Sequence, residues 1–231
     1  MRVLLVIDEI NDFGPDGALP VPEGEKVVPV TNELLEHGKF DLRVNVCEKH
    51  KPGNVSFASR YPGLKPFETH VVNGKVYTVW PDHSLENTWG ADPLPGLRVD
   101  LLDRTVVKGA DVEVHSYSGF IDDTRTVNTE LETLLLAEAQ SRGEGREDIE
   151  LFVCGLATDY CAGITALDGA NLGFKVALVL DACRAIAPET ELKMLRDLAA
   201  AGVRVIESRE VCESRELSVP QVRERTQELR A

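Results

Sequence analysis

The sequence predicts an α/β fold with three layers, in which helices cover both faces of a central, mainly parallel sheet. Two observations lead to this prediction: short apolar runs, typical of strands buried on both faces, recur along the chain, and helical segments separate them. The chain has no GxGxxG motif after its first strand and no GxxxxGKS/T motif. The common dinucleotide-binding and P-loop folds therefore lack support.

The first half of the chain predicts two strands, a helix and a long loop. The strand, helix and strand follow one another at residues 2–7, 25–36 and 41–47. Residues 49–75 are rich in Gly, Pro, Asn and Ser and predict a loop, and loops of this length in a compact domain are usually functional. A proline-rich segment follows at residues 80–96.

The second half alternates strands with helices. It predicts strands at residues 105–107, 149–154, 175–180 and 203–206. Helical patterns occupy residues 129–139, 160–172 and 189–201. We expect a single domain over residues 1–231, whose mostly charged end, 207–231, forms either a surface helix or a frayed tail.

Composition limits the partners and the compartment. The net charge of −14 argues against nucleic acid or an anionic membrane as the main partner, but says little about a small neutral substrate. The five cysteines are scattered without CxxC spacing, which fits a reducing compartment. Because the chain shows neither a signal peptide nor an apolar run of membrane-spanning length, it is predicted to be cytoplasmic.

The segment 153–161, Val-Cys-Gly-Leu-Ala-Thr-Asp-Tyr-Cys, is the most informative part of the chain. Gly155 breaks the preceding strand, and Thr158 and Asp159 offer N-caps for an alanine-rich helix. Cys161 then lies in the first helical turn, where the helix dipole and free N–H groups favour a nucleophilic thiolate. The alternative is that Cys161 is simply a packed cysteine. The remaining cysteines lie in or beside apolar runs and are interpreted as structural: Cys47, Cys154, Cys183 and Cys212.

Three polar residues are predicted at the carboxyl ends of strands, where open α/β sheets bind ligands. Asp8, Lys108 and Cys161 each have a structural interpretation alone, as a cap, a solvated strand end and a core residue. Together they form a set suited to acyl transfer. The carboxylate can act as general base, and the ammonium can lower the pKa of the thiol. No histidine lies beside Cys161 in the sequence, and this chemistry does not require one.

Five motifs resemble those of the nicotinamidase/pyrazinamidase family of isochorismatase-like cysteine hydrolases, in the same order. They are DEINDF at 8–13, WPDH at 80–83, VKG at 107–109, SYSGF at 116–120 and GLATDYC at 155–161. The resemblance extends from residue 3 to about residue 206. It implies an isochorismatase-like fold, a catalytic triad of Cys161, Asp8 and Lys108, and a cis peptide between Leu156 and Ala157. It also implies an oxyanion hole formed by the N–H groups of Ala157 and Cys161.

A second group of residues has the composition of a metal site. Glu48, His50 and His83 supply one carboxylate and two imidazoles, which suit Zn²⁺, Fe²⁺ or Mn²⁺. Without context such a short pattern is often a chance set of surface residues. The family resemblance implies one divalent metal ion at these positions, bound to the pyridine nitrogen of the substrate.

Four positions differ from the family pattern. Glu48 stands where the family has aspartate, Asn54 where some members have a further histidine, Ile10 where glutamine is usual, and Ser84 where cysteine is usual. The longer glutamate is expected to reach the metal if its backbone withdraws slightly, which the loop 51–53 would allow. Ile10 removes an amide from near the pocket, so the substrate range is expected to differ. These departures leave the identity of the metal open.

Aromatic residues complete the predicted site. Phe13 and Trp80 match the aromatic walls of the family's pocket, although both are also good core residues; Tyr117 is a weaker pocket candidate. The sequence thus predicts hydrolysis of nicotinamide to nicotinate and ammonia, in NAD salvage, through a thioester on Cys161. Two alternatives stay open: a related amidohydrolase acting on another small amide or ureido compound, and a catalytically weak relative that binds small amides. A homo-oligomer is left open as well.

Overall fold

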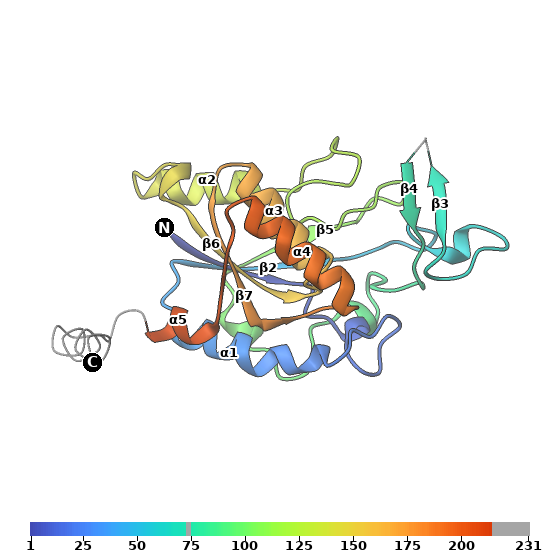
Figure 1. The fold of residues 1–231 in the computed structure, drawn as a ribbon, viewed down its shortest axis with the longest axis horizontal. Helices are drawn as coiled ribbons and strands as arrows, with labels where there is room; N and C mark the ends of the chain where they lie inside the picture. The colour runs from blue at the N-terminus through green and yellow to red at the C-terminus, as the bar shows by residue number, and fades with distance from the viewer. Residues whose placement is uncertain (73–74, 214–231) are drawn as a thin grey trace.

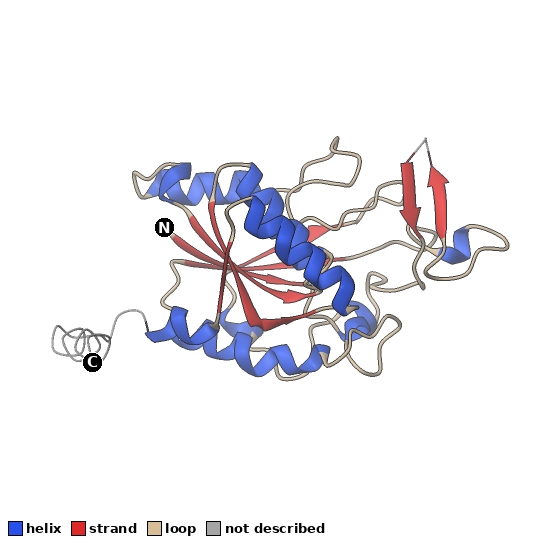
Figure 2. Ribbon diagram, viewed as in Figure 1, coloured by secondary structure: helices blue, strands red, loops and turns tan. Residues whose placement is uncertain are grey.

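The computed structural model describes residues 1–72 and 75–213. Its central sheet has six parallel strands in the order β5-β2-β1-β6-β7-β8, with helices on both faces, which confirms the predicted α/β/α architecture (Figures 1 and 2). The strands are β1 (Arg2–Ile7), β2 (Leu42–Glu48), β5 (Arg104–Lys108), β6 (Glu150–Leu156), β7 (Lys175–Arg184) and β8 (Arg204–Ile206). The helices are α1 (Val27–His37), α2 (Leu131–Ser141), α3 (Cys161–Asn171), α4 (Pro188–Ala200) and α5 (Ser208–Glu213).

Short 3₁₀ helices lie in the connections between these elements. They are η1 (Asn11–Phe13), η2 (Gly24–Lys26), η3 (Ala58–Arg60), η4 (Trp89–Ala91), η5 (Val99–Leu101) and η6 (Arg146–Asp148). Of the predicted charged tail, residues 208–213 form α5, and residues 214–231 lie outside the described part of the chain. None of the helices within the described ranges combines the length and apolar character needed to cross a bilayer.

The sheet separates two hydrophobic cores. Successive residues of β1 point to opposite faces, so Val3 and Leu5 pack with α2, α3 and α4, while Leu4 and Val6 pack with α1 and α5. Figure 2 shows these two groups of helices on opposite sides of the strands. Because both faces are covered, the central strands β1 and β6 are apolar after their first residue, and that property made them predictable from the sequence.

The loop predicted at residues 49–75 contains secondary structure, so this prediction is wrong in part. Strands β3 (Thr69–Val72) and β4 (Lys75–Thr78) form an antiparallel hairpin that projects from the body of the protein (Figure 1). Val71 and Val76 face each other across the hairpin, and both are exposed. Each strand has only four residues, and Thr69, Val71 and Val76 among them are exposed, so neither strand gives the apolar run that identifies a core strand.

The predicted N-caps of α3 are also wrong. The N-cap is Tyr160, and it makes no side-chain capping bond. The carboxylate of Asp159 instead accepts the N–H groups of Ile186 and Ala187 and the hydroxyl of Thr190. Asp159 therefore caps the start of α4 and joins it to the turn that precedes Cys161.

Candidate active site

The structure brings the three strand-end residues into contact. Lys108 ends β5, Asp8 follows β1, and Cys161 begins α3 directly behind β6. The Lys108 Nζ atom lies 2.9 Å from Asp8 Oδ2 and 3.4 Å from Cys161 Sγ. All three side chains are buried. They meet at the carboxyl ends of the parallel strands, where open α/β sheets bind their ligands.

Backbone contacts hold Asp8 and the turn before Cys161 in place. Asp8 has a left-handed backbone with φ of 48°, its N–H donates to Val46, and its Oδ1 accepts the N–H of Glu48 at 2.7 Å. Gly155 has φ of 108°, and a Cβ there would lie 2.1 Å from the carbonyl oxygen of Ile7. Only glycine allows the two strands to approach so closely at the site.

The Lys108 ammonium is the centre of the buried charge. Besides its contacts with Asp8 and Cys161, Nζ lies 3.1 Å from Glu48 Oε2 and donates to the carbonyl of Ser116 at 3.1 Å. Burial disfavours the charged form, but attraction to the neighbouring carboxylates outweighs it and raises the pKa of Lys108 well above its usual value. Lys108 therefore stays an ammonium.

The surroundings of Cys161 oppose ionisation of its thiol. Burial raises its pKa well above the usual value, and this outweighs the opposing effect of Lys108, while Asp8 and Glu48 raise it further. Desolvation and the two carboxylates therefore oppose the thiolate that the helix start is expected to favour, and Lys108 favours it. Burial also raises the pKa of Asp8, against the effect of Lys108, and this makes Asp8 a better proton acceptor for the thiol.

The peptide bond between Leu156 and Ala157 is cis, as the resemblance implies. Ala157 is buried and lines the same pocket as Cys161. The two residues predicted to form an oxyanion hole therefore line the same pocket.

The predicted metal ligands converge as well. Ligand atoms of Glu48, His50 and His83 all lie within 4.8 Å of one another, and the three residues are buried. The Nδ1 atoms of His50 and His83 lie 2.9 Å and 2.7 Å from the carbonyls of Gly109 and Pro81. A carbonyl only accepts, so each Nδ1 carries the hydrogen, and each Nε2 offers a lone pair toward Glu48.

This arrangement fits a divalent metal ion. His83 Nε2 lies 3.0 Å from Glu48 Oε1, and His50 Nε2 lies 3.5 Å from Oε2. The buried His50 Nε2 has no hydrogen-bond partner among the described residues. Although burial lowers it, the Glu48 carboxylate raises the pKa of His83; a metal ion would take the place of a proton on Nε2 and bind its lone pair. Two lone pairs and a carboxylate directed at one point are the donor set of a 2-His-1-carboxylate site.

Asn54 is not part of this cluster. Its amide donates to the carbonyl of Asp111 at 2.9 Å, and its Oδ1 accepts both the N–H and the hydroxyl of Ser56. The side chain thus holds the loop together, and three protein ligands remain for a metal.

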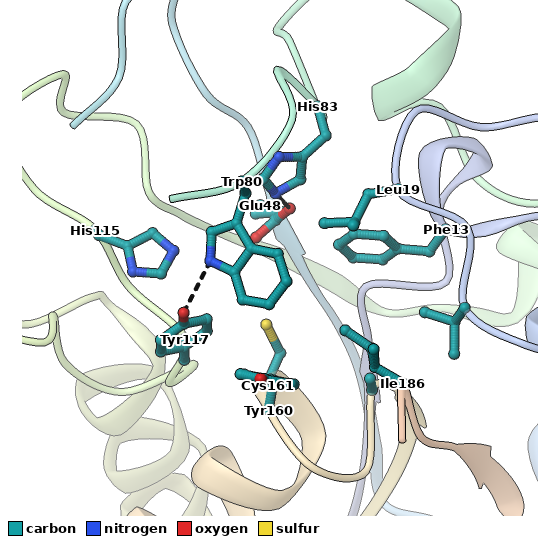
Figure 3. Close-up of a pocket in the computed structure, with 12 residues that line it drawn as sticks. Phe13, Leu19, Glu48, Trp80, His83, His115, Tyr117, Tyr160, Cys161 and Ile186 are labelled. Carbon is teal, nitrogen blue, oxygen red and sulfur yellow. Dashed lines mark hydrogen bonds and ion pairs between the residues drawn. The ribbon is translucent and has the colours of Figure 1, made fainter. Parts of the chain in front are cut away.

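Cys161 of the catalytic group and Glu48 and His83 of the metal-type cluster line one pocket (Figure 3), whereas Asp8, Lys108 and His50 are not among its lining residues. Its lining is mainly apolar and aromatic, and the close-up shows Phe13 and Trp80 flanking the space above Cys161. Tyr117 also lines it, and its hydroxyl accepts the indole N–H of Trp80 at 2.9 Å. The twelve lining residues are Phe13, Leu19, Val21, Glu48, Trp80, His83, His115, Tyr117, Ala157, Tyr160, Cys161 and Ile186.

The sequence interpretation missed five of these lining residues: Leu19, Val21, His115, Tyr160 and Ile186. Tyr160 could have been found from its position beside Cys161, and buried His115 from its position two residues before Tyr117. His115 Nδ1 lies 2.7 Å from Asp123 Oδ2. The apolar residues come from irregular segments whose sequence gives no signal.

Ile10 lies elsewhere than expected. It bridges to Pro93 and lines a separate cavity, so its effect on the substrate pocket is not direct.

Comparisons with known proteins agree on one family. A family model described as the isochorismatase domain matches residues 2–210. The nicotinamidase of Escherichia coli (strain K12) is 36% identical over 205 residues, which are 87% of this chain and 92% of that protein. A solved nicotinamidase/pyrazinamidase of Acinetobacter baumannii superposes with a TM-score of 0.82 at 30% identity, covering 91% of this chain and 97% of that one. The pyrazinamidase of Pyrococcus horikoshii, solved in complex with zinc, gives a TM-score of 0.69 at 31% identity, covering 89% and 98%.

Proposed function

The chain belongs to the isochorismatase family, and on this premise we propose that it is an amidohydrolase that converts nicotinamide to nicotinate and ammonia. The observation that carries the proposal is the contact of a buried thiol, carboxylate and ammonium beside a pocket with aromatic walls. The relatives named nicotinamidase, with which the chain aligns over most of its length, support the same substrate class.

The first half of the reaction forms a thioester. As Cys161 Sγ attacks the carboxamide carbon, its proton passes to Asp8, whose carboxylate lies within 4.8 Å of the sulfur. Lys108 stays charged and stabilises both the carboxylate and the developing thiolate. The carbonyl oxygen becomes an oxyanion, which the N–H groups of Ala157 and Cys161 are positioned to bind. The carbon–nitrogen bond then breaks, and Asp8 returns the proton to the departing ammonia.

The second half hydrolyses the thioester. Asp8 takes a proton from a water molecule, and the water oxygen attacks the acyl carbon. The carbon–sulfur bond breaks, nicotinate leaves, and the proton on Asp8 restores the thiol of Cys161. The raised pKa of both groups suits an exchange in which each takes up and gives back the same proton.

The remaining residues select and orient the ring. Phe13 and Trp80 enclose a flat ring and exclude water from the thioester. Glu48, His50 and His83 would hold one divalent ion, Zn²⁺, Fe²⁺ or Mn²⁺, which supplies a positive charge for the ring nitrogen. The zinc in the Pyrococcus horikoshii pyrazinamidase supports a metal of this kind.

The reaction would supply nicotinate for NAD salvage. The five cysteines are free, which supports a reducing compartment such as the cytoplasm.

The test is ammonia release from nicotinamide, pyrazinamide, benzamide and a small ureido compound, by protein supplied with each of the three metals. We expect hydrolysis of the two ring-nitrogen amides. His83→Ala should lower kcat/KM for nicotinamide far more than for benzamide, because benzamide has no ring nitrogen. Hydrolysis of the ureido compound alone would instead support a related amidohydrolase. No ammonia from any compound would support a binding relative.

A further inference from the structure

Ser84 lies in the shell around the metal-type cluster. Its side chain is completely buried, and its hydroxyl donates to Glu48 Oε1 at 2.7 Å. We propose that Ser84 is a positioning residue for the metal site, and that its hydroxyl fixes the carboxylate of the longer Glu48 in the orientation that binds metal. This inference rests on the proposed function only in that the same cluster serves catalysis.

Ser84 is itself held rigidly. Its backbone is left-handed with φ of 52°. Its N–H donates to Asp12 Oδ2 at 2.6 Å, and its carbonyl accepts the N–H of His50 at 2.8 Å. It also directly follows His83 in the chain. Ser84 therefore connects the segments that carry the two histidines with the 8–13 motif. Because its backbone is fixed, the position from which its hydroxyl donates is fixed as well.

The backbone of Glu48 is fixed too. It is the last residue of β2, it pairs with Lys108 in the sheet, and its N–H donates to Asp8 Oδ1 at 2.7 Å. The sequence-based expectation that the backbone withdraws through the loop 51–53 is therefore not supported. The extra methylene of glutamate is accommodated in the side chain, so the carboxylate needs its own restraint.

Two donors restrain the two carboxylate oxygens. Lys108 Nζ lies 3.1 Å from Oε2, and the Ser84 hydroxyl lies 2.7 Å from Oε1. Oε1 is also the oxygen nearest His83 Nε2, at 3.0 Å. Without Ser84, the strong attraction of Lys108 would be free to turn the carboxylate away from His83. The Ser84 hydroxyl on Oε1 opposes the attraction of Lys108 for the carboxylate. Because the hydroxyl is neutral, Glu48 keeps its negative charge for a metal ion.

Loss of the hydroxyl should therefore weaken metal binding 10- to 100-fold, the usual effect of removing a residue that orients a metal ligand. The measurement is the dissociation constant of Zn²⁺ by competition with a chelating dye, using Ser84→Ala in the full chain. Co²⁺ absorption spectra would report the ligand geometry independently of activity. A matched control is Ser56→Ala, which removes an equally buried hydroxyl that donates to Asn54 at 2.8 Å. The control should bind Zn²⁺ within twofold of the unaltered protein.

A second measurement tests whether Ser84 and Glu48 are a matched pair. Ser84→Cys provides a weaker donor, and Glu48→Asp withdraws the carboxylate from the hydroxyl. Each should weaken Zn²⁺ binding, and the double variant should bind more tightly than the product of the two losses predicts. Thermal melts of metal-free protein would identify any variant that fails to fold. If Ser84→Ala does not fold, Ser84→Cys takes its place in the Zn²⁺ measurement.

Zn²⁺ affinity within twofold of the unaltered protein in Ser84→Ala would overturn the inference, and the hydroxyl would then serve stability alone. Strictly independent losses in the double variant would overturn the pairing. Neither result depends on hydrolysis. A protein in which Ser84 controls Zn²⁺ binding but which releases no ammonia from nicotinamide would contradict the proposed function and leave this inference standing.

Discussion

At the scale of single residues, the site is organised around one buried cation. The Lys108 ammonium contacts two carboxylates, a thiol and a carbonyl within 3.4 Å. Its charge allows Asp8 and Glu48 to be buried side by side, which two carboxylates alone would not tolerate. Burial raises the pKa of the Cys161 thiol, against the effect of Lys108. In the proposed mechanism the nucleophile forms when Asp8 takes the proton of this thiol.

Cys161→Ala should abolish hydrolysis without unfolding the protein, because the side chain is small and the fold does not depend on its sulfur. Mass spectrometry of the unaltered protein with a slow substrate should show an acyl adduct on Cys161. The control is Cys183→Ala, which removes a buried thiol outside the pocket lining and should keep activity. An adduct on another cysteine, or activity in Cys161→Ala, would contradict the assignment.

Asp8→Asn and Lys108→Met should each lower kcat by several orders of magnitude, and their effects should be far from additive. The reason is that base, thiol and ammonium act as one unit. Lys108→Met also leaves two carboxylates unpaired in the interior, so we expect a loss of about 3–5 kcal/mol in stability. Kinetics and urea unfolding of the two single variants and the double variant measure both effects. If the double variant loses the product of the single losses in kcat, the groups act independently.

At the scale of elements, the sequence predicts strands better than it predicts the loops that complete the site. Strand β1 and strand β6 are covered on both faces, so their sequences are apolar after the first residue. Asp8 follows the end of β1, whereas β6 continues through Gly155, the predicted break, to Leu156. The hairpin β3–β4 has short, partly exposed strands and gives no such signal. Leu19 and Ile186 lie in irregular segments that lead to the pocket. The course of these segments depends on tertiary contacts, which leave no periodic pattern in the sequence.

Asp159 shows the same limit within one element. Its position before a helix predicts a cap for α3, but its carboxylate caps α4 and holds the backbone of Ile186, a pocket residue. Local sequence shows only the helix start that follows Asp159 in the chain. It does not show that the start of α4, which is distant in the chain, lies close to the carboxylate in space.

Asp159→Ala should therefore destabilise the protein by about 1.5–3 kcal/mol, since it removes hydrogen bonds to a buried carboxylate. It should also lower kcat/KM, because the backbone of Ile186 loses its restraint. Thr190→Val is the matched control, since it removes only the hydroxyl that donates to the same carboxylate. Urea unfolding and ammonia release measure the two effects. Equal values of kcat/KM in both variants would show that the capping interaction does not reach the pocket.

At the scale of the whole molecule, the catalytic group and the metal-type cluster both depend on the order of the strands in the sheet. The parallel order β5-β2-β1-β6 places Lys108, Glu48, Asp8 and the turn before Cys161 side by side, although 153 residues separate the first of them in the chain from the last. The alternation of strands and helices predicts a parallel sheet, and the strand ends predict the catalytic residues. The strand order itself is set by packing between distant segments.

The same packing buries a further carboxyl group, and its ionisation should affect how stability depends on pH. Glu9 follows Asp8, its side chain is buried, and its Oε1 accepts the hydroxyl of Thr31 at 2.5 Å. Its Oε2 has no hydrogen-bond partner among the described residues. Burial, opposed only in part by Thr31, raises the pKa of Glu9 to about 8.

The sign of the effect follows from proton binding. Between the unfolded pKa of 4.5 and the folded pKa of about 8, the unfolded chain has lost this proton while the folded protein keeps it. Folding therefore becomes less favourable as pH rises through this window, by up to about 1.4 kcal/mol per pH unit, and the loss levels off above it. Glu9→Gln removes the contribution of this carboxyl group to the pH dependence of the free energy of unfolding. The new amide changes that free energy by an amount that does not depend on pH.

The measurement is the free energy of unfolding in urea at pH 5, 6, 7 and 8 for the unaltered protein and for Glu9→Gln. The variant should gain stability relative to the unaltered protein with each step in pH. A difference that stays constant from pH 5 to pH 8 would mean that Glu9 ionises in the folded protein as it does in the unfolded chain. In that case the core beneath α1 would have to admit a charge that its apolar contacts otherwise exclude.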